Sequence, residues 1–321
     1  MAQLTTYLDF EKPLADLEAK IVELQTAGGA SGASIEDEVS KLREKAAKQL
    51  RDIYSNLNAW QKAQVARHPD RPHLQDYIDG LFDDFVELAG DRKFMNDEAI
   101  IGGLAKFRGR SIVVIGHEKG RDTQTRIKHN FGMGRPEGYR KAVRLMELAG
   151  RFGLPVIALV DTSGAFPGKG GEERGQAEAL ARSIEACLTL DTPMVSVIVG
   201  EGGSGGAVAL ASGNKVLMME HAIYSVISPE GAASILFRDA KRAKDTAEAM
   251  KITAQDLEKF RIVDGVIPEP MGGAHRDPGA AITRLGDAVD AALGSLKGMS
   301  ADELRTQRKE RFYAIGREGL A

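Results

Sequence analysis

The sequence has few residues that could form covalent or metal cross-links. Cys187 is the only cysteine among 321 residues, which excludes an intrachain disulfide and any zinc site built on several thiolates. Cys187 lies in a stretch with helical periodicity, where we predict a small buried residue. The fold must therefore be held together by its hydrophobic core.

Long apolar runs, an export signal and a strong net charge are also missing. No stretch reaches the roughly 18 uninterrupted apolar residues of a membrane span. The start, MAQLTTYLDFEK, has no basic region followed by an apolar core, which predicts a cytoplasmic location. A net charge of −3 argues against nonspecific nucleic-acid binding. With 43% hydrophobic and 28% charged residues, the chain can bury one large core or two modest ones.

Apolar residues recur at helical spacing in two stretches near the N-terminus. The first runs from Glu11 to Gln25 and the second from Ile35 to about Asn56, with the link GGASGAS between them. This pattern predicts an antiparallel helical hairpin. We expect its narrow apolar stripe to pack on the body of the protein or on a partner, rather than to form a core alone. A cover for the chain's own domain and a partner-binding arm both remain open.

The next segment is polar and contains prolines. Residues Lys62–Arg71 indicate a loop near a domain boundary, and His68 and His73 flank its prolines. Histidines in such a loop are expected at the surface rather than in a metal pair. From Leu74 to Leu88, apolar residues at helical spacing predict an amphipathic helix.

Strands and helices alternate through the remainder of the chain. A hairpin of two strands is predicted first, followed by helices and buried strands; the expected elements are strands 99–107, 111–117, 154–161, 194–199, 215–219, 222–227 and 262–267, and helices 137–152, 176–189 and 229–237. This order indicates an α/β fold with parallel pairing. Ligands of such sheets gather beyond the carboxyl ends of the strands, where the glycine-rich loops after Asp161 and Val199 lie.

The stretch GEGGSGGAVALAS (200–212) is the richest of these loops. It follows the buried strand Met194–Val199, and four of its glycines surround Ser204. A strand, a glycine turn and a helix leave peptide N–H groups at a helix N-terminus, where the dipole favours negative charge. The pattern predicts an oxyanion hole of main-chain amides that holds an enolate or a ureido oxygen. A turn that only packed a helix on a sheet would need fewer glycines.

Two other chemistries compete for these loops. The G-x-S-x-G pattern of serine hydrolases surrounds Ser204, but an acid and a histidine must then follow. His221 and His275 are the only histidines downstream, and His275 is expected in a surface loop. The stretch GAFPGKG (164–170) is similar to a Walker A phosphate loop, yet it is one residue short and lacks the Ser or Thr that holds magnesium.

Four strings in the chain point together to one family. They are NFGMGRPEGYRKAVRLM (130–146), DTSGAFPG (161–168), GEGGSGGAVA (200–209) and YSVISPEGAASILF (224–237). In this order they resemble the alpha subunit of the bacterial acetyl-CoA carboxylase carboxyltransferase, a member of the crotonase superfamily. The resemblance covers nearly the whole chain, including the helical arm and a basic C-terminal helix near Asp302–Phe312.

The resemblance implies a fold and a division of the chain. The fold is an α/β, crotonase-like (ClpP/crotonase) spiral of β-β-α units with an N-terminal helical hairpin. The arm would occupy residues 1–58, the carboxyltransferase domain residues 59–298 and the basic C-terminal helix residues 299–321. Enzymes of this family move a carboxyl group from carboxybiotin to acetyl-CoA, and malonyl-CoA for fatty acid synthesis results.

Partners are implied in the same way. The carboxybiotin is a co-substrate carried on a lysine of the biotin carboxyl carrier protein. Biotin carboxylase is a further implied partner. Two alpha and two beta subunits form the active enzyme, and each site is shared between an alpha and a beta chain. The zinc-binding cysteines belong to the beta subunit, so no metal is expected on this chain.

The resemblance also assigns the candidate site residues. The catalytic segment is Gly205, Gly206 and Ala207, with the N–H groups of Gly206 and Ala207 on the biotin ureido oxygen and Gly205 allowing the close approach. The enolate hole would lie mostly in the beta subunit. No side-chain base is required, because biotin itself takes the α-proton from acetyl-CoA in the family's mechanism.

Other residues are expected in supporting roles. Gly164 and Ala165 are predicted to form a wall or a second donor near biotin, and Lys169 to pair with a carboxylate or phosphate, unless it is merely solvated. Arg135 and Arg140 are predicted to approach the anionic parts of CoA.

Two further classes remain open. A crotonase-fold hydratase or isomerase working alone would need acids beside the hole, and Glu201 and Glu230 are the candidates. However, the sequence around Glu230 also indicates a first-turn acid after the helix N-cap Ser228. A non-catalytic assembly protein is the second class, supported by the N-terminal arm.

Overall fold

A computed structural model describes residues 6–27 and 32–317 of the chain. Part of the predicted glycine link, residues 28–31, lies outside the described residues. Among the helices that are described, none combines the length and the apolar character needed to cross a membrane.

Strands and helices alternate through the body, as the sequence predicts. The strands are β1 (Asp83–Glu87), β2 (Ile100–Phe107), β3 (Arg110–His117), β4 (Val156–Thr162), β5 (Met194–Gly203), β6 (Lys215–Met219), β7 (Ile223–Ser225) and β8 (Gly265–Ile267). The helices are α1 (Lys12–Ala27), α2 (Gly32–Tyr54), α3 (Ala59–Ala66), α4 (Leu74–Leu81), α5 (Thr123–Lys128), α6 (Pro136–Phe152), α7 (Lys169–Glu173), α8 (Gln176–Thr189), α9 (Ser204–Val208), α10 (Pro229–Phe237), α11 (Ala243–Met250), α12 (Ala254–Lys259), α13 (Pro278–Ser295) and α14 (Ala301–Ala314). Short 3-10 turns lie at Asp9–Glu11, Asn130–Gly132 and Ala240–Arg242.

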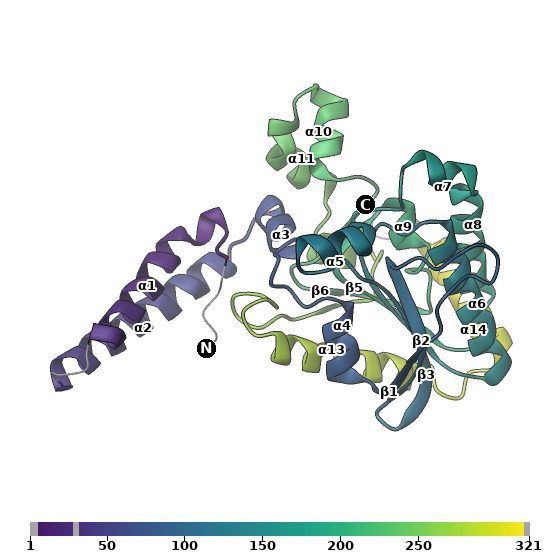
Figure 1. The fold of residues 1–321 in the computed structure, drawn as a ribbon, viewed down its shortest axis with the longest axis horizontal. Helices are drawn as coiled ribbons and strands as arrows, with labels where there is room; N and C mark the ends of the chain where they lie inside the picture. The colour runs from purple at the N-terminus through teal and green to yellow at the C-terminus, as the bar shows by residue number, and fades with distance from the viewer. Residues whose placement is uncertain (1–5, 28–31, 318–321) are drawn as a thin grey trace.

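The described strands form one sheet in the order β1-β2-β3-β4-β5-β6-β8, with β7 paired to the end of β5. The pairs among β1, β2 and β3 are antiparallel, and the pairs from β3 onward are parallel. A Cβ on Gly102 would contact Leu145 of α6, whereas one on Gly116 would contact Leu74 of α4. Because these glycines occupy opposite faces of the sheet, helices cover it on both sides (Figure 1). This explains why every residue of β4 and β5 is buried.

The helical hairpin of α1 and α2 projects from one side of the body (Figure 1). The predicted apolar stripes of the two helices face each other in a small cluster of their own; its buried members are Leu14, Ile21, Val39 and Ala46. The expectation that the stripe would not form a core alone is therefore wrong. An antiparallel partner helix buries the stripe instead of the body.

The segment after α4 is a strand, where the sequence predicts a continuous helix over Leu74–Leu88. The helix ends at Leu81, and Asp83–Glu87 pair antiparallel with β2. A Cβ on Gly103 would lie 2.0 Å from the carbonyl oxygen of Val86, so this glycine lets the two backbones approach. Pairing across the sheet overrides the local helical spacing.

Two predictions about the polar segment after the arm are wrong. Residues Ala59–Ala66 form α3 rather than a loop. His68, His73 and His275 were expected at the surface, but they are 2%, 6% and 4% exposed. The loops that carry His68 and His275 pass between the arm and the body, so the packing of the arm buries their side chains.

The last helix is fixed to the sheet by one buried cation. Arg308 in α14 is fully buried, and its guanidinium donates to the carbonyl oxygens of Cys187 and Thr192 at 2.7 and 2.8 Å and to Oδ1 of Asn214 at 2.8 Å. These acceptors lie where α8 ends and where β5 and β6 begin. Cys187 is buried, as predicted.

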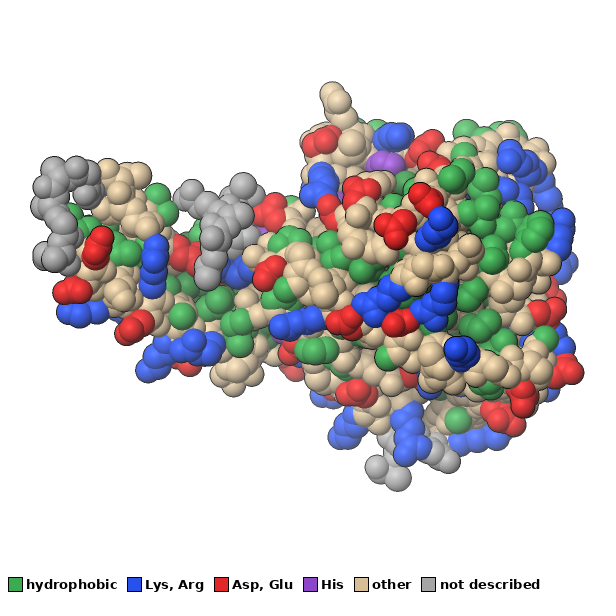
Figure 2. Space-filling view, turned by 90° about the horizontal axis from the view of Figure 1, so that it is seen from below, with side chains coloured by type: hydrophobic (Ala, Val, Ile, Leu, Met, Phe, Trp, Pro, Cys, Tyr) green, Lys and Arg blue, Asp and Glu red, His purple; other side chains and the backbone are tan. Residues whose placement is uncertain are grey.

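Acidic and basic side chains are interspersed on the face of the molecule drawn in Figure 2. This mixture agrees with the net charge of −3.

Candidate active site

The residues after β5 have the predicted strand, turn and helix geometry. We call residues 203–206 the glycine turn. β5 ends at Gly203, and α9 begins at Ser204, which is exposed and has a φ of 52°. This left-handed conformation is uncommon for a residue with a side chain. The N–H groups of the first turn of a helix have no acceptor inside the helix, so they are available to a ligand.

The residues after β4, which we call the facing loop (163–168), pack directly against the glycine turn. A Cβ on Gly206 would lie 2.7 Å from the nitrogen of Ala165 and 2.8 Å from the carbonyl carbon of Gly164. A Cβ on Gly203 would lie 2.2 Å from the carbonyl oxygen of Ser163. Only glycine fits at both positions, and the structure brings the predicted residues of the two segments together.

The amides of the facing loop are not equivalent. The N–H of Gly164 donates to Oγ1 of Thr162 at 3.1 Å, and that hydroxyl donates to the carbonyl of Gly164 at 2.7 Å. The N–H of Phe166 donates to the carbonyl of Gly134 at 2.9 Å. The N–H of Ala165 has no acceptor among the described residues. Ala165 can therefore offer a main-chain donor to a ligand.

The amides of α9 differ in the same way. Ala207 is the fourth residue of the helix and fully buried, and the N–H at that position ordinarily bonds to the carbonyl of the N-cap residue, here Gly203. Gly205 and Gly206 precede it, where the N–H groups have no such acceptor. These two glycines are the better placed donors of the predicted catalytic segment.

Arg140, predicted to approach CoA, is engaged within the fold. Its guanidinium donates to Asp91 at 2.8 Å, to Glu137 at 3.0 Å and to the carbonyl of Arg174 at 3.1 Å. These contacts hold α6 against neighbouring loops. A role for Arg140 in binding CoA stays a prediction.

The other two predicted basic residues flank the facing loop. The guanidinium of Arg135 lies 5.0 Å from the ring centre of Phe166, a member of that loop. Lys169 begins α7, its side chain is 89% exposed, and its Nζ is 3.3 Å from a carboxylate oxygen of Glu173. An exposed pair of this kind contributes little to stability, so Lys169 is free to exchange Glu173 for a ligand.

The acids that a hydratase would need are bound by cations. Nζ of Lys119 lies 2.7 Å from Oδ1 of Asp161 and 2.8 Å from Oε2 of Glu201. Arg67 bonds the other oxygen of Glu201 and also Glu230, each at 2.6 Å. Burial alone would raise the pKa of Glu201, but Lys119 and Arg67 lower it to about 2. A carboxylate so firmly ionised is not a general acid.

These cations line a cavity of about 220 Å³ beside the facing loop. Its walls are formed by Ala66, Arg67, His68, Pro69, Arg71, His73, Lys119, Gly120, Arg126, Phe131, Asp161, Ser163 and Glu201. Sequence reasoning missed Lys119 and Arg67. Lys119 is the second residue after β3, and its place near a carboxyl strand end is a signal that could have found it. No sequence signal marks Arg67.

The two histidines downstream of Ser204 lie elsewhere. The rings of His221 and His275 are 5.6 and 6.4 Å from the ring of Tyr54 in α2. Both therefore belong to the junction between the arm and the body. A serine hydrolase acting through Ser204 would lack its base.

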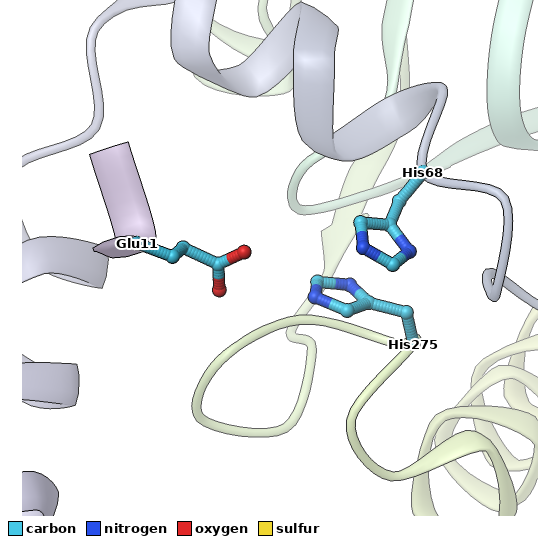
Figure 3. A group of neighbouring side chains, drawn as sticks. All are labelled: Glu11, His68 and His275. Atoms are coloured by element: carbon cyan, nitrogen blue, oxygen red, sulfur yellow. The ribbon is translucent and has the colours of Figure 1, made fainter. Parts of the chain in front are cut away.

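The same junction contains a group of possible metal ligands. Glu11, His68 and His275 are buried, with ligand atoms within 4.8 Å of one another (Figure 3). The two imidazoles are stacked, with ring centres 3.9 Å apart and planes inclined by 20°, so their in-plane lone pairs do not converge. Nδ1 of His68 accepts the N–H of Asp70, and Nε2 faces the carbonyl of Thr6. This geometry favours a structural junction over a metal centre.

The junction is expected to weaken in mild acid. Burial and the neighbouring charge of His68 lower the pKa of His275 to about 2, so the fold favours the neutral ring. The stability that this provides is complete above the unfolded pKa of about 6.5 and is lost as the pH falls, by about 1.4 kcal/mol per unit. Urea unfolding at pH 7 and pH 5 should show a loss of about 2 kcal/mol from this histidine.

A His275→Asn variant is the control for this prediction. The side chain of asparagine does not titrate, so the difference between the two pH values should shrink by about 2 kcal/mol. Glu201 and Glu269, with pKa values of about 2, do not titrate in this window. An equal pH dependence in variant and wild type would contradict the prediction.

Solved structures with a similar architecture include a transcarboxylase, a subunit of a carboxylase and a decarboxylase. Transcarboxylase 12S matches with a TM-score of 0.54 and 20% identity, over 66% of this chain and 41% of that one. The beta subunit of P. aeruginosa geranyl-CoA carboxylase matches with a TM-score of 0.55 and 17% identity, over 77% of this chain and 46% of that one. A chain of the Pseudomonas malonate decarboxylase MdcD-MdcE hetero-dimer matches with a TM-score of 0.55 and 15% identity, over 68% of this chain and 89% of that one. The chain therefore has the crotonase-like fold that the resemblance implies.

Sequence comparison narrows this class to one family. The family described as "Acetyl co-enzyme A carboxylase carboxyltransferase-like" matches residues 7–316. Proteins named acetyl-coenzyme A carboxylase carboxyl transferase subunit alpha are 65% identical in *Caulobacter* sp. (strain K31) and 64% in *Methylobacterium nodulans*, over 98% of this chain and 98% and 99% of theirs. The chain belongs to this family of carboxyltransferase alpha subunits, and the resemblance is confirmed.

Proposed function

We propose that this chain, together with a beta subunit, transfers the carboxyl group of carboxybiotin to acetyl-CoA and so forms malonyl-CoA. The observation that carries this proposal is the contact between the glycine turn and the facing loop, which places unpaired main-chain donors side by side. The names of the full-length relatives supply the substrates.

The main-chain donors fit the charge that the reaction develops. When carbon dioxide leaves carboxybiotin, negative charge appears on the ureido oxygen. The N–H groups of Gly205, Gly206 and Ala165 would hold that oxygen, while Ala207 closes the wall behind them. Fixed donors at a developing charge are typically worth about a hundred- to a thousandfold each in rate.

The side chains around the site fit the same reaction, because none has to act as a base. Glu201 is ionised but held by Lys119 and Arg67, and biotin can take the α-proton itself. Arg135 and Lys169 lie at the edge of the facing loop, where an anionic part of a substrate would pass.

The remaining partners follow from the reaction. Carboxybiotin would arrive on the biotin carboxyl carrier protein after its formation by biotin carboxylase, and the beta subunit would supply the enolate hole and the zinc site. The division into residues 1–58, 59–298 and 299–321, and the cytoplasmic location, stay predictions.

Co-purification with the beta subunit tests the function. The chain should bind the beta subunit, and the complex should form malonyl-CoA from acetyl-CoA and carboxybiotin on its carrier. Neither subunit should do so alone, because each would hold part of the site. The measurement is the rate of malonyl-CoA formation by the complex and by each subunit.

The same preparations separate the competing functions. Hydration of an enoyl-CoA by the chain alone would contradict the proposal and favour a stand-alone hydratase. A complex that assembles but never transfers a carboxyl group would favour an assembly role.

A further inference from the structure

The strand that leads into the glycine turn contains an irregularity. β4 and β5 pair in parallel from Val156 and Met194 up to Val160 and Ile198, but Thr162 then pairs with Gly202. Between these two pairs, β5 advances by four residues while β4 advances by two. The two extra residues of β5 form a bulge just before the glycine turn. Bulges of this kind re-aim the residues that follow, and they are frequent next to active sites.

The carboxylate of Asp161 fills this bulge. Its Oδ1 accepts the N–H of Glu201 at 2.8 Å. A Cβ on Gly200 would lie 2.5 Å from the same oxygen, so the bulge closes around the carboxylate only because a glycine is there. Asp161 belongs to β4, which leads into the facing loop, and its carboxylate binds the main chain of β5, which leads into the glycine turn. One residue therefore joins the two strands that precede the amide-bearing segments.

Lys119 completes the arrangement from a third segment. Its Nζ joins Asp161 to Glu201, and Arg67 binds the other oxygen of Glu201. Lys119 and Glu201 have side chains only 17% and 12% exposed. Burial alone would lower the pKa of Lys119, but Asp161 and Glu201 outweigh it and raise the pKa above its ordinary value. Lys119 and Glu201 are therefore both charged, and each has an oppositely charged partner.

We propose that Lys119, Asp161 and Glu201 form a positioning cluster that fixes the glycine turn relative to the facing loop. The proposal rests on the proposed function, since the two segments together would bind the ureido oxygen. Neither carboxylate nor the ammonium needs to touch the substrate. Asp161 acts through the main-chain N–H of Glu201 that it binds, and Lys119 acts through the two carboxylates that it joins.

Stability alone does not account for these residues. Replacing a buried ion pair with apolar side chains of similar volume is often neutral or stabilising. A charged cluster differs from an apolar layer in fixing directions, because its hydrogen bonds depend on the direction of each donor. Main-chain donors that bind a developing charge must point at it, and a displacement of about 1 Å can lower the rate a hundredfold.

The test is Lys119→Met in the complex with the beta subunit. This change keeps an unbranched side chain of similar length to the apolar part of lysine and removes the charge. We expect kcat to fall about a hundredfold, with the KM for acetyl-CoA near its wild-type value. Hydrogen exchange of the amides in residues 200–206 should become faster. A second change, Glu201→Gln, should lower kcat little further when it is added to Lys119→Met, because the cluster acts as a unit.

Arg308→Met is the matched control. It also removes a buried cation, but one that binds beside the starts of β5 and β6, so it should lower the unfolding temperature without changing kcat per folded molecule or exchange in residues 200–206.

Three outcomes would overturn the proposal: an unchanged kcat in Lys119→Met, an unchanged amide exchange, or a higher KM for carboxybiotin with kcat intact, which would make Lys119 a substrate ligand. If the wild-type complex transfers no carboxyl group, the proposed function fails, while hydrogen exchange still tests the cluster.

Discussion

Gly206→Val is expected to lower malonyl-CoA formation by the complex about a thousandfold or more, because it displaces main-chain donors on both segments. The Cβ of valine would lie 2.7 Å from the nitrogen of Ala165, 2.8 Å from the carbonyl carbon of Gly164 and 2.9 Å from the hydroxyl of Tyr139. Two of these contacts are backbone, which cannot rotate away as a side chain does. The facing loop and the glycine turn must therefore separate.

Gly294→Ala in α13 is the control for this substitution. No heavy atom lies within 4 Å of the Cβ that it adds, so the rate should stay at the wild-type level. Co-purification of Gly206→Val with the beta subunit should be normal, which separates a loss of chemistry from a loss of assembly. Wild-type activity in this variant would show that the amides do not bind the reacting atoms.

Glu269→Ala is expected to destabilise the fold by about 3–5 kcal/mol, the range for breaking one partner out of a buried ion pair. Both oxygens of Glu269 bond the guanidinium of Arg71, and the side chains are 0% and 2% exposed. Glu269 also accepts the N–H groups of His221 and Ala274. The variant would leave the buried cation of Arg71 without its counter-ion and two buried N–H groups without their acceptor, which urea unfolding at pH 7 would measure.

An exposed ion pair gives the comparison. Asp84 pairs with Lys106 at 2.7 Å, with side chains 69% and 52% exposed, and Asp84→Ala should cost less than about 1 kcal/mol. Similar losses in Asp84→Ala and Glu269→Ala would mean that burial does not set the strength of the Arg71 pair.

Much of the fold follows from local sequence patterns. The hairpin of α1 and α2 was predictable because its apolar residues repeat at 3.6-residue spacing, and β4 and β5 because their residues are almost all apolar. The strand at Asp83–Glu87 was not, since its pairing partner Gly103 is distant in the chain. The burial of His68 depends on the arm, which no local pattern reveals.

The candidate site divides in the same way. The glycine turn was recognisable because close backbone contact requires glycine at Gly203 and Gly206. The difference between Gly164 and Ala165 was not, because it depends on where the hydroxyl of Thr162 points. The cluster around Lys119 joins three segments that only the folded sheet brings together.

The anchoring of α14 by Arg308 has a consequence for biosynthesis. This helix is synthesised after the strands of the sheet, yet its guanidinium satisfies carbonyl groups that belong to the middle of the chain. Until residue 308 has left the exit tunnel, those carbonyls can bond only to water. These hydrogen bonds therefore cannot form while the strands are being synthesised, and premature termination before this arginine would leave the acceptors beside β5 and β6 without their donor.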